Sequence, residues 1–187
     1  MRTTSMAGVL MTAALISAWY PTVAQEKGKT AAAELTSGSQ AALDNLSGSV
    51  PLANLLRPKA QAILVFPKVT KAGLGIGGQY GEGSLLKGAT AAGFYKTTGA
   101  SFGLQAGGQQ YGYAMFFMNA KALDDFVNAS GFEVGVGPSV VLVDEGMAKT
   151  TTTNTLKDDI YAFVFGQKGL MAGLGIQGNK ITKITPK

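Results

Sequence analysis

The sequence predicts an α+β fold, a β-rich single domain with a mainly antiparallel, glycine-rich sheet or closed barrel and a few helices, including N-terminal ones. Two observations predict this class. Up to about residue 60, and again near residue 120, apolar residues recur at helical spacing. From Ala62 onward, short apolar runs alternate with glycine-containing segments, and 26 of the 187 residues are glycine, as in strands joined by tight turns. The length suits one domain that buries a substantial core.

Residues 1–24 have the organisation of a secretory signal peptide. Arg2 supplies the positive end, residues 7–19 form an apolar run, and Thr22-Val23-Ala24 is a small-residue cleavage motif. The apolar run is shorter than the roughly 18 to 20 residues that cross a bilayer as a helix. We therefore expect residues 1–24 to be removed and the mature protein to be periplasmic or secreted.

Three segments are predicted to be helical. Residues 25–50 form a helical or partly flexible N-terminal segment, because the leucines fall on one side of a helix while Gly38 weakens it by up to about 1 kcal/mol. Residues 51–59 form a second, short helix with proline in its first turn. Residues 119–129 form a third helix, with Asn119 as the N-cap.

Ten apolar, β-branched or aromatic segments are predicted strands. They are residues 62–66, 73–80, 93–95, 101–109, 113–118, 133–136, 140–143, 160–165, 170–177 and 180–184. Pro67 is expected to end the first strand or to place it at a sheet edge. Val65-Phe66 followed by residues 72–76 returns as Val164-Phe165 followed by residues 172–176, which we interpret as two equivalent strand pairs in one pseudo-symmetric sheet.

The composition argues against an enzyme. The sequence contains no cysteine and no histidine, which removes the ordinary zinc ligands and the usual base for a serine nucleophile. Gly73-x-Gly75-x-x-Gly78 matches a dinucleotide-binding pattern, but a predicted strand follows it where the phosphate site needs a helix. Gly99-x-Ser101-x-Gly103 resembles a nucleophile elbow inside an alternating strand pattern. We predict no catalytic activity, no metal and no cofactor.

The charge balance favours anionic partners. The formal net charge is +5, and removal of Arg2 with the signal peptide leaves +4. The basic residues are scattered along the sequence, so no nucleic-acid-binding tract is indicated.

Several motifs, in order, resemble the SYLF domain family, in its exported bacterial branch, which is related to the yeast actin-binding SYLF proteins. They are residues 62–69, 75–83, 101–107, 135–140, 158–163 and 169–173. The resemblance covers roughly residues 40–184, and we assign residues 51–187 to a SYLF-like domain. It implies binding of phospholipid through a basic surface, and eukaryotic members, which bind phosphoinositides, use an amphipathic N-terminal helix for this purpose.

The resemblance and the basic excess together select a set of lipid-binding residues. Residues 25–50 hold only Lys27 and Lys29 as bases, so a strongly cationic membrane helix is not reproduced there, and the segment 51–59 is the better candidate. The predicted residues are Arg57, Lys59, Lys68, Lys71, Lys180 and Lys183, with Leu52, Leu55 and Leu56 as apolar contacts. Each charge near an anionic membrane contributes about 1 kcal/mol.

The expected partner is an anionic phospholipid surface of the bacterial envelope, such as one containing phosphatidylglycerol or cardiolipin, because phosphoinositides are rare and actin is absent outside the cytoplasm. The alternative is a structural or protein-interaction module that binds an envelope protein through exposed strand edges. A small outer-membrane barrel is a third interpretation, against which several predicted strands are shorter than the roughly 9 to 11 residues required.

Overall fold

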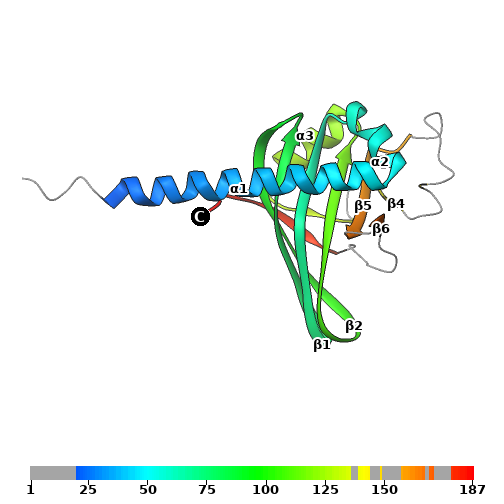
Figure 1. Ribbon diagram of the computed structural model, residues 1–187. Helices are drawn as coiled ribbons and strands as arrows, with labels where there is room; N and C mark the ends of the chain where they lie inside the picture. Colours follow the sequence, from blue (N-terminus) through cyan, green and yellow to red (C-terminus); the bar gives the residue numbers. More distant parts are fainter. Residues whose placement is uncertain (1–19, 136–138, 144–147, 149–156, 167–168, 171–177) are drawn as a thin grey trace, which may run out of the picture.

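The computed structural model describes residues 20–135, 139–143, 148, 157–166, 169–170 and 178–187. Within them the chain forms helices that pack on a curled, mixed sheet of seven strands (Figure 1). This confirms the predicted β-rich α+β class. The elements are α1 (Tyr20–Ser49), α2 (Pro51–Leu56), the 3-10 helix η1 (Arg57–Lys59), β1 (Ala62–Lys87), β2 (Thr90–Phe117), α3 (Ala120–Asn128), β3 (Phe132–Glu133), β4 (Val140–Val143), β5 (Ile160–Gly166), β6 (Gly169–Leu170) and β7 (Lys180–Ile184).

The three predicted helices are confirmed. α1 covers residues 25–49 of the segment predicted for residues 25–50 and begins earlier, at Tyr20, so the expected cleavage position after Ala24 falls in its first turns. Pro51 occupies the first turn of α2, where its missing N–H costs no hydrogen bond. Asn119 caps α3, because its Oδ1 accepts a hydrogen bond of 2.8 Å from the backbone N–H of Ala122. None of the helices in the described ranges has the length and apolar character needed to cross a bilayer.

The prediction of several short strands between residues 62 and 118 was wrong in number. These segments merge into β1 and β2, which pair from Ala62 with Phe117 to Lys87 with Thr90, with three register shifts, around a turn at Gly88. The glycines interrupt the side-chain pattern on which the prediction rested, but their backbone groups still pair. Figure 1 shows the resulting long ribbon projecting away from α1.

Pro67 does not end the first strand. β1 continues through a register shift between Phe66 and Val69, and such a bulge accommodates a proline that lacks a ladder donor. β1 pairs only with β2 among the described strands. The second predicted outcome for Pro67, a place in an edge strand, is therefore confirmed.

The ribbon folds back on itself, so the two halves of β1 lie against each other along a seam between residues 65–72 and 77–83. A Cβ atom added at Gly81 would lie 2.8 Å from the carbonyl oxygen of Lys68, and one at Gly83 would lie closer still to the carbonyl of Val65. Only glycine permits this approach. α1 crosses the seam, and the Ser39 hydroxyl donates to the Val65 carbonyl at 3.2 Å.

The sheet has two ends that share β2. Residues 112–117 of β2 pair with β5, which pairs in parallel with β4, whereas residues 94–98 pair with β7, which pairs with β3. The internal repeat is explained in part by this arrangement. Phe66 and Val164 both pair with Tyr113, so the two Val-Phe copies flank β2 from opposite sides. Residues 172–176, the rest of the second copy, lie outside the described residues.

The curled sheet separates two cores. The inner core lies inside the curl and is closed by α3, whose Phe126 ring lies 4.9 Å, centroid to centroid, from the rings of Tyr95 and Phe117. The outer core lies between the sheet and the α1–α2 pair, and includes Leu43, Leu46, Leu56, Ile63 and Phe116. The alternation of inward and outward residues along β1 supplies both cores.

The strands predicted at residues 140–143, 160–165 and 180–184 are confirmed as β4, β5 and β7, whereas two other predicted strands are shorter or only partly described. β3 ends at Glu133 because a turn follows, with Gly135 at φ 100°. Of the strand predicted at residues 170–177, only Leu170 falls among the described residues, in β6. The two glycine motifs lie within β1 and β2, respectively, and neither opens a helix, which agrees with their structural interpretation.

Candidate functional site

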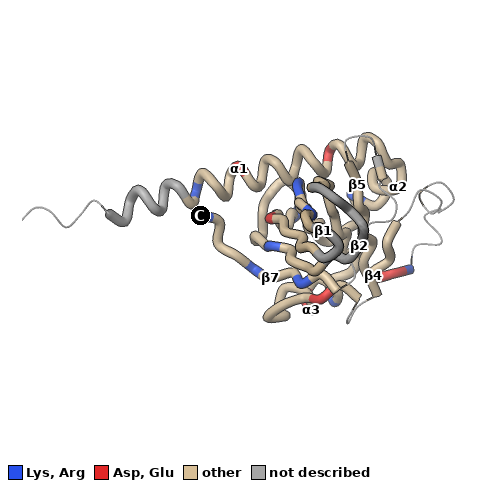
Figure 2. Tube along the Cα trace, turned by 90° about the horizontal axis from the view of Figure 1, so that it is seen from below, with Lys and Arg blue, Asp and Glu red and all other residues tan. Residues whose placement is uncertain are grey.

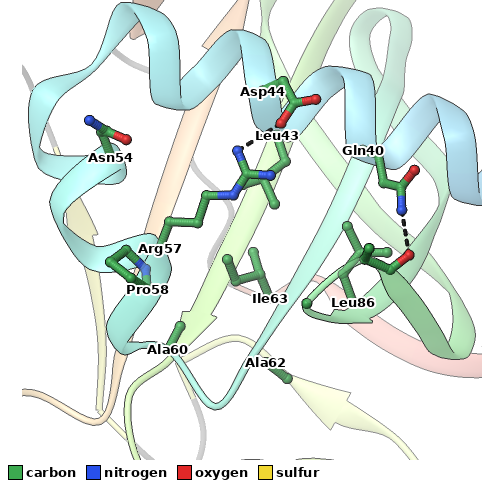
Figure 3. A pocket seen from close by; sticks show the side chains of 12 residues that line it. Gln40, Leu43, Asp44, Asn54, Arg57, Pro58, Ala60, Ala62, Ile63 and Leu86 are labelled. Atoms are coloured by element: carbon green, nitrogen blue, oxygen red, sulfur yellow. Dashed lines mark hydrogen bonds and ion pairs between the residues drawn. The ribbon is translucent and has the colours of Figure 1, made fainter.

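Two grooves flank α1 and hold part of the predicted lipid-binding set. The Arg57 groove, of about 670 Å³, lies between α1, the α2–η1 corner and the β1–β2 turn (Figure 3). It is lined by Gln40, Leu43, Asp44, Asn54, Arg57, Pro58, Ala60, Ala62, Ile63, Leu86, Gly88 and Ala89. The Lys68 groove, of about 450 Å³, lies on the other flank. It is lined by Ala41, Ala42, Asn45, Pro67, Lys68, Gln110, Tyr111, Gly112, Phe165 and Gly166.

The Arg57 groove has an apolar floor and a rim whose charges are paired. Leu43, Ile63 and Leu86 are buried and belong to the outer core. Figure 3 shows Arg57 reaching across the groove toward Asp44, and its Nη1 lies 2.7 Å from Asp44 Oδ1, with 38% and 64% of the two side chains exposed. Arg57 therefore contributes no unpaired positive charge here.

The opposite edge of this groove is fixed by a side-chain contact. The Gln40 side-chain amide donates to the carbonyl oxygen of Ala89 in the β1–β2 turn (Figure 3). Gly88 reaches a φ of 60° in that turn, a conformation that favours glycine. The groove is thus bounded by α1 on one side and by a turn that α1 itself holds in place.

The Lys68 groove carries a cation with no carboxylate among the residues that line it. Lys68 is exposed and sits in the β1 bulge. Asn45 and Gln110 are exposed carboxamides on the same rim. The floor is apolar, because the Phe165 ring lies over Gly112, where an added Cβ would be 2.5 Å from Phe165 Cε2.

The other predicted lysines lie away from both grooves. Lys71 faces Gln109 across the ladder and shares its side of β1 with the buried Val69. Lys180 and Lys183 are exposed on β7, and Lys180 lies opposite Glu133. Lys59 is exposed at the end of η1.

The convergence of the predicted cations is therefore partial. Gly81 lies against Lys68 and pairs with Thr97, which pairs with Ile181 of β7. Lys68 is therefore separated from β7 by three strand spacings of roughly 4.8 Å each. This separation exceeds the screening length of about 10 Å at 0.1 M salt. Figure 2 shows the basic segments of β1, β2 and β7 between α1 and α3, and acidic segments on α3.

Ion pairing divides the basic residues further. Within the described part of the chain the ion pairs are Arg57 with Asp44 and Lys121 with Asp125. Of the six predicted basic residues, only Arg57 belongs to either of them. Lys68 is the one of the remaining five that also lines a groove.

Two of the three predicted apolar lipid contacts do not reach the surface. Leu52 and Leu56 are 2% and 0% exposed, because this face of α2 packs into the outer core beneath α1. Leu55, on the opposite face, is 39% exposed. Only Leu55 is available to a membrane in this conformation.

The sequence did not reveal three groove residues, Asp44, Asn45 and Gln110. Asp44 and Asn45 are neighbours on α1, yet the helix places them on opposite flanks, in different grooves. Gln110 joins the Lys68 groove through the pairing of β2 with β1, in which it lies opposite Thr70. Only the helical angle of about 100° per residue hints at the first separation.

A buried polar chain leads from Tyr111, which also lines the Lys68 groove, to Gln79 and Asn179. The Tyr111 hydroxyl donates to Gln79 Oε1 at 2.6 Å, and the Gln79 amide donates to Asn179 Oδ1. Burial raises the pKa of Tyr111 to about 12, and burial also raises the pKa of the enclosed Tyr113. Both phenols therefore stay neutral at physiological pH, and the chain serves as a structural link between β1, β2 and the segment before β7.

Comparison with known proteins adds an assignment to this geometry. Residues 98–185 match a family model described as Ysc84, Las17-binding protein actin regulator. No curated protein matches the chain. The matched segment runs from the middle of β2 to the end of β7, and it contributes Gln110, Gly112 and Phe165 to the Lys68 groove but nothing to the Arg57 groove. Over residues 98–185 the chain is therefore similar to the SYLF (Ysc84) domain family, in agreement with the resemblance predicted from its motifs, and that family is linked to lipid and actin binding.

Proposed function

We propose that this chain is a non-enzymatic module that binds anionic phospholipid surfaces of the bacterial envelope peripherally, through the Lys68 groove. One observation carries the proposal: an exposed lysine stands at the rim of a groove whose lining contains no carboxylate. The family's link to lipid binding supports the ligand class.

The groove's chemistry suits a phosphodiester headgroup. The Lys68 ammonium has three donors, and the carboxamides of Asn45 and Gln110, which line the same groove, each have two. Charge-assisted hydrogen bonds of this kind are about twice as strong as neutral ones. The Phe165 ring and Pro67 offer apolar surface to the glycerol backbone below the phosphate.

The remaining basic residues act at longer range in this proposal. Lys59, Lys71, Lys180 and Lys183 raise the positive potential without lining either groove, and the mature charge of +4 sets its sign. Such long-range attraction weakens as salt shortens the screening length from about 10 Å at 0.1 M to about 3 Å at 1 M. Binding is expected to fall as salt increases.

Export is part of the proposal, because the lipid surface depends on the compartment. We propose that residues 1–24 are removed and that the mature chain, beginning at Gln25, acts in the periplasm or after secretion. Intact-mass measurement of protein recovered from the periplasm tests this step. A mass equal to that of the full 187 residues would contradict it.

The binding test is liposome flotation with vesicles of phosphatidylcholine, alone or with phosphatidylglycerol. Lys68→Gln should weaken binding to anionic vesicles roughly fivefold, the equivalent of about 1 kcal/mol. Lys87→Gln is the matched control, because Lys87 is exposed on the same strand but outside both groove linings. Equal effects of the two variants would contradict a site centred on Lys68.

A second candidate function has its own observation. Leu142 is 44% exposed on β4, which among the described strands pairs only with β5. An exposed apolar edge strand suits a structural or protein-interaction module of the envelope. Absence of vesicle binding together with a stoichiometric partner lost in Leu142→Lys would favour this function.

A further inference from the structure

We propose that the Arg57 groove binds a zwitterionic glycerophospholipid, one whose headgroup carries a phosphate and a primary ammonium close together, as phosphoethanolamine does. The inference rests on the proposed lipid-binding function but concerns a different groove and a different headgroup class. Its residues lie outside the segment matched by the family model.

The first step is that the Asp44–Arg57 pair uses only part of each group. A guanidinium has five N–H donors and a carboxylate has two oxygens, whereas one Nη1–Oδ1 contact of 2.7 Å joins them. The described residues provide no other hydrogen-bond or ion-pair partner for either side chain. Both are more than one-third exposed, so the unused donors and the second oxygen are open to a ligand.

The second step is charge complementarity. An anionic ligand at this rim is attracted by Arg57 and repelled by Asp44, and a cationic ligand meets the reverse. A zwitterion laid antiparallel to the pair satisfies both, with its phosphate against the guanidinium and its ammonium against the carboxylate. The Asn54 carboxamide on the same rim supplies a further polar contact.

The third step concerns the floor of the groove, because apolar surface there favours a lipid over a small soluble zwitterion as the ligand. The groove measures about 670 Å³, within the roughly 300 to 1,000 Å³ typical of small-molecule sites. Leu43, Ile63 and Leu86 lie buried beneath it, and the apolar surface that a ligand reaches is that of the half-buried Ala60 and the exposed Pro58 and Ala89. A headgroup alone leaves this apolar surface wet, whereas the glycerol and first acyl carbons of a lipid cover it.

The test titrates the full chain with dihexanoyl phosphatidylethanolamine below its micelle concentration, followed by calorimetry and by methyl NMR of Leu43, Ile63 and Leu86. We expect saturable binding with shifts at these methyl groups. Asp44→Asn and Arg57→Gln should each weaken binding roughly fivefold or more. The controls Glu34→Gln and Lys29→Gln, both at exposed positions of α1, make the same charge changes outside the groove lining and should have no effect.

Two further ligands identify the source of the headgroup. Free phosphoethanolamine should bind at least tenfold more weakly than the lipid, because it cannot cover the floor. Dihexanoyl phosphatidylglycerol, which lacks the ammonium, should bind the unmodified chain more weakly than the phosphatidylethanolamine does. It should bind Asp44→Asn more tightly than the unmodified chain, because the repelling carboxylate is gone.

Ala89→Trp keeps the test valid if a charge variant folds poorly. Ala89 is an exposed rim residue, so a large side chain there blocks the groove without removing a charge, and binding should be lost. The inference is overturned if the methyl groups do not shift, if Asp44→Asn binds unchanged, or if free phosphoethanolamine binds as tightly as the lipid. Lys68→Gln should leave this titration unchanged, so loss of anionic-vesicle binding in that variant tests the proposed function separately.

Discussion

The two grooves share one wall, α1, yet differ in charge because of two adjacent residues. Asp44 faces the Arg57 groove and pairs with its cation, whereas Asn45 faces the Lys68 groove and leaves its cation unpaired. Both grooves have a cation and an apolar floor, so neither feature distinguishes one groove from the other. The comparison teaches that the placement of one carboxylate on α1 decides which groove is suited to an anionic headgroup.

The largest expected effect on both grooves comes from opening the seam that α1 covers. Gly83→Ala places a Cβ against the Val65 carbonyl and the Phe66 ring, and relief requires the two halves of β1 to separate. We expect a loss of about 3 kcal/mol or more in the free energy of unfolding, measured by chemical denaturation. Both grooves should lose their ligands together.

Gly48→Ala is the control for this prediction. Gly48 lies in α1 and an added Cβ meets nothing within 4 Å, so alanine should raise stability by about 0.5 to 1 kcal/mol. A Gly83→Ala protein as stable as the unmodified chain would show that the seam tolerates a side chain.

The next largest effect separates the two faces of α2. Leu56→Ala should destabilise the chain by about 3 kcal/mol, because Leu56 is fully buried in the outer core that supports both grooves. Leu55→Ala should cost under about 1 kcal/mol, because that side chain is 39% exposed. Thermal unfolding of both variants measures the difference, and equal losses would contradict the burial pattern.

Vesicle binding provides a second measurement for the exposed Leu55. If Leu55 contacts the membrane, Leu55→Ser should weaken binding to anionic vesicles while leaving thermal stability close to that of the unmodified chain. Unchanged vesicle binding would leave the lysines as the sole predicted contacts.

Sequence reasoning succeeded where a feature depends on neighbouring residues. The N-cap at Asn119, the proline at the start of α2 and the β-rich class all follow from local patterns. It failed where a feature depends on residues far apart in the chain. The length of β1, the fold-back at Gly81 and Gly83, and the burial of Leu56 all arise from tertiary contacts.

The candidate site shows the same division. The basic residues are visible in the sequence, and Lys68 was among those predicted to bind lipid. The sequence gives no sign that Asp44 neutralises Arg57, because the two are 13 positions apart, in α1 and η1, with α2 between them. Charge counting treats all cations alike, and only the packing of α1 against η1 distinguishes these two.

Exchanging Asp44 and Asn45 on α1 tests directly whether the position of the carboxylate decides which groove binds an anionic headgroup. The double variant Asp44→Asn/Asn45→Asp keeps composition and net charge but moves the carboxylate from the Arg57 groove to the Lys68 groove. Lipid shifts induced by dihexanoyl phosphatidylglycerol should move from the residues of the Lys68 groove to those of the Arg57 groove, with a change of roughly fivefold in affinity at each. Methyl and backbone NMR on the unmodified chain and the double variant measures both sites at once.

Each single variant serves as a control for the exchange. Asn45→Asp alone should weaken the Lys68 groove without strengthening the other, and Asp44→Asn alone should do the converse. Phosphatidylglycerol shifts that stay at the Lys68 groove in the double variant would show that the helix does not hold these residues on opposite flanks in solution.

The smallest expected effect is on stability. The Asp44–Arg57 pair is exposed enough for water and salt to compete with it, so Asp44→Asn should change the free energy of unfolding by under about 1 kcal/mol. Chemical denaturation at low and high salt measures this change, and the difference between variant and unmodified chain should shrink as salt rises. A loss of several kcal/mol would mean that the pair holds α1 to η1. The pair would then have a structural role, and the contrast between the two grooves would no longer point to their ligands.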